Sequence, residues 1–188
     1  GSPASGRAAM LAIAESCGPL VSLDLTGAEA RLTDSPALLA VHGATLLELR
    51  LGGSTVASEV APRGDRAVLE LAAALASCDQ LRALDLGDLG MEPAMRKPVM
   101  GLLQRCAPTL RRLSGALPVV VILNGLSSLF RTGTCRDGGA RSLEHVCLVA
   151  AQTGLGPGCR SLVEVLGFSA RTLRHLRLRG ASAHDLLG

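Results

Sequence analysis

The fold is decided by the stretch Leu81-Arg82-Ala83-Leu84-Asp85-Leu86-Gly87, which follows the apolar run LELAAALASC at 69–78. The leucines of this stretch are spaced LxxLxL. The last two alternate as in a strand, while the apolar residues of the preceding run recur at helical spacing. The sequence therefore predicts a helix, a short turn and a short strand here. If the unit recurs, it determines the fold of the whole chain.

The same unit recurs along the chain. Motifs of this kind, some of them degenerate, begin at Leu20, Leu46, Leu81, Leu110, Leu143 and Leu173. Their central residues lie at positions 23, 49, 84, 113, 146 and 176, so the intervals between them are similar but irregular. In the fourth motif Gly115 replaces the third leucine, so we expect a weaker strand there. Six copies at intervals of about 30 residues predict a repeat array.

Apolar residues at helical spacing precede most of the motifs, and we expect them to form buried stripes. Ser35 and Asp65 suit helix N-caps, and Pro36 and Pro157 suit first turns. The helical spacing of 122–130 favours a helix over 120–130, although Val119-Val120-Val121 also suits a strand of its own. The expected stripes are Met10, Leu11, Ile13, Ala14 and Cys17; Leu38, Leu39 and Val41; Val68, Leu71, Ala72 and Leu75; Val99, Leu102, Leu103 and Cys106; and Leu162, Val163, Val165 and Leu166.

The domain organisation follows from this rhythm. We expect residues 1–7 to be a disordered or vector-derived N-terminal segment and residues 8–180 to be one repeat domain. Polar, glycine-containing insertion loops interrupt it at 54–64 and 131–141. Terminal repeats normally need polar caps. We therefore expect the end at 181–188 to be covered by a partner, or the chain to be a piece of something longer.

Composition limits the class of protein. The 188 residues suffice for one domain with a substantial core, which must be built from Leu, Val, Ile and Ala because only Phe130 and Phe168 are aromatic. A net charge of +3 is too small for a dedicated nucleic-acid binder. The most apolar window, 117–130, contains Pro118 and polar residues and does not predict a membrane span.

The six cysteines suit a reducing, intracellular compartment, with the cytoplasm favoured and an organelle matrix left open. Cys17, Cys78 and Cys106 lie on helical faces that we expect to be buried, where a thiol behaves as a small hydrophobic side chain. The first six residues show no signal-peptide pattern.

The strings LAAALASCDQLRALDLGD (71–88), LLQRCAPTLRRLSG (102–115) and VEVLGFSARTLRHLRLRG (163–180) resemble leucine-rich-repeat proteins. They are most similar to the ribonuclease-inhibitor-like repeats and to the cysteine-containing repeats found beside F-box domains. The resemblance implies a right-handed α/β solenoid of about six repeats, with a parallel concave sheet and convex helices. One feature departs from the family. The positions that usually hold a ladder of Asn or Cys carry Ala28, Ser54, Leu89, Pro118, Ala151 and Ala181.

On each strand the leucines should point inward and the alternate residues outward to the concave face. The acidic outward residues gather in the first three repeats and the basic ones in the last. Such a charge gradient suits a protein partner, and the alternative is a merely solvated face. The strongest candidates are His175, Arg177 and Arg179. The full set of candidate partner-binding residues is Asp24, Glu48, Arg50, Asp85, Arg112, His145, His175, Arg177 and Arg179.

Other chemistries fit the sequence poorly. Arg174 would face away from Arg177 and Arg179, and no aromatic side chain is near to stack on bases, so nucleic-acid binding is disfavoured. His145, Cys147, Cys135 and Cys159 contain no CxxC pair and match no usual zinc module. The chain has no GxSxG motif, and the loop 154–158 lacks the pattern of a phosphate loop. We expect no enzyme activity, no metal, no cofactor and no small-molecule substrate.

These observations predict a noncatalytic protein-protein interaction scaffold, as a structural or adaptor subunit of a larger intracellular assembly. The loops at 54–64 and 131–141 are further candidates for contact with a partner. The resemblance also permits the substrate-recognition arm of an F-box-type ubiquitin ligase, although residues 1–19 are too few to hold an F-box. An RNA-associated subunit of a ribonucleoprotein is the alternative from a different class.

Overall fold

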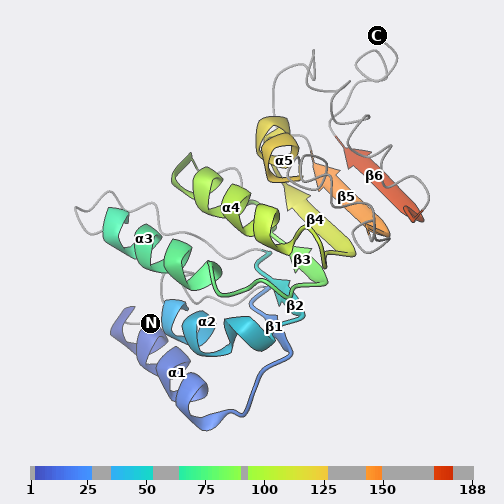
Figure 1. The fold of residues 1–188 in the computed structure, drawn as a ribbon. Coiled ribbons are helices and arrows are strands. Elements are labelled where there is room, and N and C mark those ends of the chain that lie inside the picture. Colours follow the sequence, from blue (N-terminus) through green and yellow to red (C-terminus); the bar gives the residue numbers. More distant parts are fainter. Residues whose placement is uncertain are drawn as a thin grey trace.

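The computed structural model describes residues 3–26, 35–52, 64–89, 93–126, 143–149 and 172–179, in which helices alternate with strands (Figure 1). The α-helices are α1 (Pro3–Ser16), α2 (Pro36–His42), α3 (Gly64–Leu75), α4 (Arg96–Cys106) and α5 (Val119–Leu126). Short 3-10 helices, η2 (Gly43–Thr45) and η4 (Pro93–Met95), adjoin α2 and α4. The strands are β1 (Ser22–Asp24), β2 (Glu48–Arg50), β3 (Ala83–Asp85), β4 (Arg112–Ala116), β5 (His145–Val149) and β6 (His175–Arg179).

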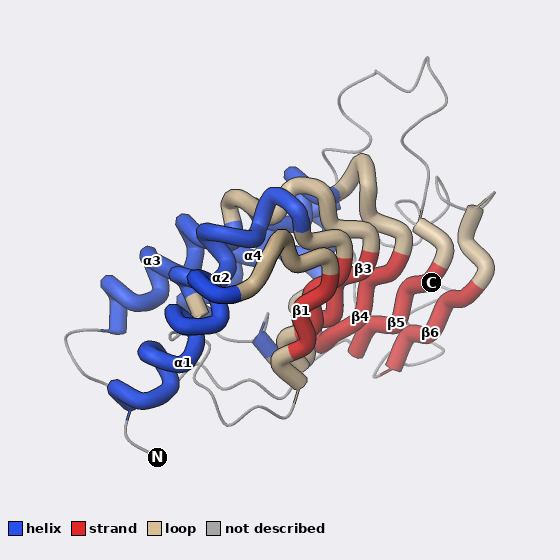
Figure 2. The backbone as a smooth tube through the Cα atoms, turned by 90° about the horizontal axis from the view of Figure 1, so that it is seen from below, coloured by secondary structure: helices blue, strands red, loops and turns tan. Residues whose placement is uncertain are grey.

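The strands form one parallel sheet in chain order, β1 to β6, and the sheet is not closed. The helices of the described ranges lie along one face of this sheet (Figure 2). We call the other face, which was expected to be concave, the open face. The predicted α/β class with a parallel sheet is thus confirmed. Parallel neighbours need a crossover between them, and in the described ranges α2, α3, α4 and α5 lie in the crossovers that lead from β1 to β5.

The six motif centres align in a single row across the sheet. Leu23 pairs with Leu49, and the row continues without a shift through Leu84, Leu113 and Val146 to Leu176. The four inner members are at most 1% exposed, as expected for residues between sheet and helices. At the two ends, Leu23 is only partly buried and Leu176 is 46% exposed. The interior assignment is therefore wrong for Leu176.

Helix α4 buries all four residues of its expected stripe, Val99, Leu102, Leu103 and Cys106. In α2 the stripe consists of Leu38, Leu39 and His42, whereas Val41 is 60% exposed. Burial of Val41 was a wrong prediction. At about 3.6 residues per turn, positions 38, 39 and 42 lie on one side of the helix. Position 41 lies about 100° around the helix from the middle of that side.

Helix α1 corrects two further expectations. It begins at Pro3, so residues 3–7 are helical rather than disordered, and the alternative of a vector-derived segment stays a prediction. Of its expected stripe only Met10 and Ala14 are buried, while Leu11, Ile13 and Cys17 are exposed. The physical reason is its place at the end of the helix layer, where α2 is the helix that it contacts.

Gly115 does not shorten its strand. β4 has five residues, more than the three of β1, β2 or β3, and it includes Gly115 paired with Leu148. The backbone of Gly115 has φ +139°, a value that side chains rarely permit, and an added Cβ would lie 3.0 Å from the carbonyl oxygen of Gly87. Glycine is therefore what allows β4 to approach the end of β3 so closely.

Several other predictions can be placed on the structure. Residues 119–126 are helical, as favoured over a strand, and Pro36 occupies the first turn of α2. Ser35 precedes that helix without a side-chain capping bond, and Asp65 lies inside α3 rather than before it. Of the insertion loop expected at 54–64, Gly64 instead begins α3. Residues 54–63, the loop at 131–141, residues 127–130, the helix expected after Pro157 and the end at 181–188 lie outside the described residues. Among the helices that are described, none has the length and apolar character that crossing a bilayer requires.

Candidate protein-binding surface

The open face carries two outward rows of side chains, fixed by the strand register. The first outward row runs Ser22, Glu48, Ala83, Arg112, His145 and His175. The second outward row runs Asp24, Arg50, Asp85, Ser114, Cys147 and Arg177, and Arg179 lies beyond it beside Val149. The nine candidate residues therefore all occupy outward positions. Glu48 and Asp85 are partly buried and the other seven are exposed.

The N-terminal half of the open face is not simply acidic. Arg50 lies in register between Asp24 and Asp85, and its guanidinium forms an ion pair of 3.5 Å with Asp24. Asp24 Oδ1 accepts a bond of 2.8 Å from the N–H of Thr26, and Asp85 Oδ1 accepts one of 3.0 Å from Gly87. The bonds from Thr26, with a smaller contribution from Arg50, hold the pKa of Asp24 below its ordinary value.

These two aspartates have a structural role that sequence reasoning missed. An aspartate that accepts the N–H two residues ahead forms an Asx turn, which bends the chain after the strand. The sequence patterns that could have indicated these turns are Asp-x-Thr at 24–26 and Asp-x-Gly at 85–87. One oxygen of each carboxylate, Oδ1, is thus engaged in a turn within the chain, while the Asp24 side chain stays exposed.

The C-terminal half of the open face is basic. Arg112, His145 and His175 are consecutive members of the first outward row, on β4, β5 and β6. The two imidazole rings stack with centroids 6.0 Å apart. In the adjoining rows, Arg177 is preceded by Ser114 and Cys147, and Arg179 is paired with Val149. None of these described positions carries a carboxylate. We define the basic surface as Arg112, His145, His175, Arg177 and Arg179, a set suited to charge-assisted bonds with carboxylates.

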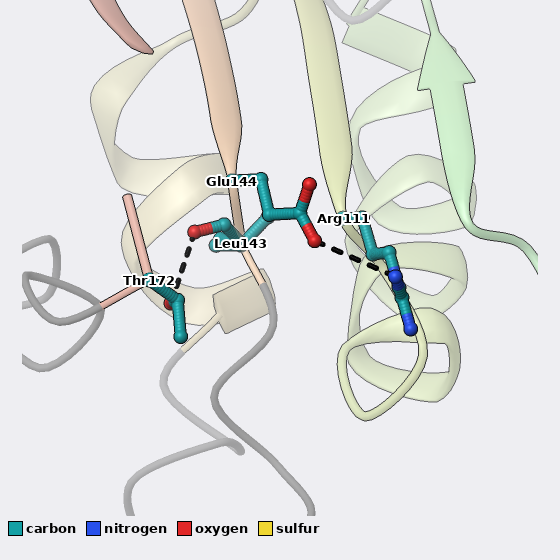
Figure 3. A network of polar contacts seen from close by, with 4 residues as sticks. All are labelled: Arg111, Leu143, Glu144 and Thr172. Atoms are coloured by element: carbon teal, nitrogen blue, oxygen red, sulfur yellow. Dashed lines mark hydrogen bonds and ion pairs between the residues drawn. The ribbon is translucent and has the colours of Figure 1, made fainter. Parts of the chain in front are cut away.

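In the last four motifs the residue after the first leucine is charged: Arg82, Arg111, Glu144 and Arg174. There Arg111 on the β4 side forms an ion pair of 3.5 Å with Glu144 on the β5 side (Figure 3). Both side chains are partly exposed, so the pair contributes little to stability. Arg174 occupies the equivalent position before β6.

Threonine hydroxyls connect three pairs of neighbouring sequence motifs. Thr45 Oγ1 donates to the carbonyl of Leu20 at 2.8 Å, and Thr109 Oγ1 donates to Leu81 at 2.8 Å. Thr172 Oγ1 donates to Leu143 at 3.1 Å (Figure 3). Each threonine directly precedes the first leucine of its own motif and binds the first leucine of the motif before. That recurring Thr-Leu pair was a visible signal that sequence reasoning did not use.

The cysteines of the described residues differ in exposure. Cys78 and Cys106 are fully buried, as predicted, whereas burial of Cys17 was a wrong prediction. Burial raises the pKa of Cys78 to about 11 and that of Cys106 to about 12, so both remain protonated and unreactive at neutral pH. Within the described ranges no group of three or more His, Cys, Asp or Glu side chains is placed to hold a metal ion. Cys135 and Cys159 lie outside these ranges.

Comparison of the chain with models of known protein families and with curated proteins finds no match. The open face offers fixed charges on a regular backbone. Such a surface can orient and hold a partner through complementary charge.

Proposed function

We propose that this chain is a leucine-rich-repeat solenoid that serves as a noncatalytic protein-binding scaffold or adaptor subunit in an intracellular assembly. Support for the solenoid comes from the motif centres, which share one register across six strands, and from the threonine bonds between neighbouring repeats. Stacked units of this kind bury in common a core that no single unit could bury. The buried, protonated thiols of Cys78 and Cys106 favour a reducing compartment.

The observation that carries the proposed function is the basic surface. Its five exposed side chains lie on three neighbouring strands, and the sheet fixes their spacing. A partner that presents carboxylates at matching positions would be held without any change in the backbone of the sheet. Charge complementarity of this kind determines which partner binds and in what orientation.

The test is capture of partners by the tagged chain from its own cells, with quantitative mass spectrometry. The variant Arg112→Glu with Arg179→Glu reverses charge in the basic surface, and Arg82→Glu reverses an exposed arginine outside it. We expect the first variant to lose proteins that the wild type captures and the second to retain them. Equal capture by all three forms would refute the assignment of the site. Capture that nuclease abolishes would instead identify an RNA-associated subunit, and recovery of a cullin-type ligase core would identify a ligase arm.

A further inference from the structure

We propose that the two ends of the sheet bind each other in separate molecules. In this arrangement β6 of one copy pairs in parallel with β1 of a second copy, so that copies stack head to tail. This self-association goes beyond the proposed function and is tested independently of it.

The backbone bonding pattern shows how the two edges would fit. At each of the five junctions between neighbouring strands, one carbonyl accepts two N–H groups from the next strand, as Val21 does from Leu47 and Glu48 at 2.8 and 3.1 Å. The last such acceptor is Glu144, which receives Arg174 and His175 at 2.8 and 3.0 Å. In the next step the carbonyl of Arg174 would accept the N–H groups of Val21 and Ser22 of a second copy. Among the described strands none pairs with the outer edge of β1 or of β6, and such edges are templates for this kind of pairing.

The side-chain register places unlike charges together at this junction. Continuing the second outward row sets Arg177 beside Asp24 of the next copy, just as Arg50 lies beside Asp24 and Asp85 within one chain. Continuing the other rows sets His175 beside Ser22 and Arg179 beside Thr26, with no like charges opposed. Opposite charges on neighbouring strands stabilise a sheet and like charges destabilise it. Pairing of β6 with β6 of a second copy would bring the arginines of the two strands together. Because like charges destabilise a sheet, the head-to-tail arrangement is favoured.

Apolar surface is exposed at both ends. Leu176 of β6 is 46% exposed, although its register equivalents Leu84 and Leu113 are 1% exposed. At the other end Val21 is 54% exposed, and Leu11 and Ile13 of α1 are 45% and 42% exposed. Stacking would place Leu176 against Leu23 of the next copy and give it the neighbour that each inner leucine has. Burial of such surface favours association.

The contact is heterologous, because each copy uses a different surface to bind its neighbour. Such contacts add further copies as concentration rises unless the rotation between copies closes a ring. The wild-type chain should therefore increase in mass with concentration rather than stop at a dimer.

The test uses sedimentation velocity across a wide concentration range. Arg177→Asp and Asp24→Arg each oppose like charges at the junction, and each should raise the apparent dissociation constant about tenfold. An equimolar mixture of the two should recover association, because Asp at 177 of one variant then meets Arg at 24 of the other. Ser22→Pro removes an edge N–H without altering either charge and should also weaken stacking. Arg82→Asp is the control and should behave as the wild type.

Circular dichroism of each variant checks that it is folded. A wild type that remains monomeric at every concentration overturns the proposal. It is equally overturned if folded Arg177→Asp associates as the wild type does, or if the mixture fails to recover association. The stacking variants leave Arg112 and Arg179 unchanged and are measured on the purified chain, so loss of stacking and loss of partner capture can be told apart.

Discussion

Substitution of Gly115 by alanine tests the close approach of β4 to the end of β3. An alanine Cβ would lie 3.0 Å from the carbonyl oxygen of Gly87, 3.0 Å from Leu86 Cβ and 3.2 Å from the nitrogen of Gly87. Backbone and Cβ atoms cannot move aside as the end of a long side chain can. The residue also has φ +139°, which strains any L side chain by about 1–3 kcal/mol. With the tight contact added, we expect Gly115→Ala to lower the free energy of unfolding by about 2–4 kcal/mol.

A matched glycine gives the opposite expectation. Gly101 lies inside α4, where the nearest heavy atom to an added Cβ is Arg105 Nη1 at 3.5 Å, an ordinary contact. Gly101→Ala should therefore raise the free energy of unfolding by about 0.5–1 kcal/mol, because alanine favours the helix. Urea unfolding followed by circular dichroism measures both values. The account of β4 fails if Gly115→Ala unfolds at the same urea concentration as the wild type, or if both alanines shift stability in the same direction.

Three further predictions concern the core and the repeat contacts. Leu84→Ala should lower the free energy of unfolding by about 2–5 kcal/mol because the side chain is 1% exposed, whereas Leu69→Ala, at a position 68% exposed, should change it by less than about 0.5 kcal/mol in the same urea titration. Thr109→Val should cost about 1 kcal/mol, since the carbonyl of Leu81 loses its hydroxyl donor; an unchanged urea midpoint would count against the threonine bonds. Because burial raises the pKa of Cys78 from 9.0 to about 11 and that of Cys106 to about 12, the folded state holds protons that the unfolded state loses first. The contribution of these thiols to the free energy of unfolding should therefore be full below pH 9 and should fall as pH rises from there towards 12. In urea titrations at several pH values, this fall should be shallower in the Cys78→Ala, Cys106→Ala double variant than in the control Cys17→Ser.

The repeating part of the fold was predictable because it depends on local periodicity. The LxxLxL spacing placed Leu49, Leu84, Leu113 and Val146 in one buried row, and strand alternation placed Arg112 and His145 outward. Both inferences need only the geometry of a strand and an adjacent apolar helix. The basic surface could be predicted for the same reason.

The ends of the array could not be predicted in this way. A periodic pattern is the same in the middle of the chain and at its ends, but burial depends on neighbours. Leu11 and Leu176 fit their motifs and are nevertheless exposed, because a residue at an end has packed neighbours on one side. Helix α2 shows a different limit. Its apolar side chain favoured Val41 for the core, but the direction in which each position points from the helix buries His42 instead. His42 Nε2 has no hydrogen-bond partner among the described residues.

Polar contacts between repeats were the other part that sequence reasoning missed. Thr45 and Thr109 bind carbonyls of the preceding repeat, and these partners become evident only when the strand register is known. Asp24 and Asp85 were identified as outward residues, and their bonds to Thr26 and Gly87 show that they also form turns after their strands. A charge pattern alone does not separate these two roles.

The central claim, that the open face binds the partner, is tested most directly by photo-crosslinking. A photoreactive amino acid is placed at Ser114, in the second outward row, or at Val41, which is 60% exposed on helix α2 of the other layer. The two chains are compared for covalent capture of a partner identified by mass spectrometry. The account predicts a crosslink from position 114 and none from position 41. A crosslink from position 41 with none from position 114 would contradict it.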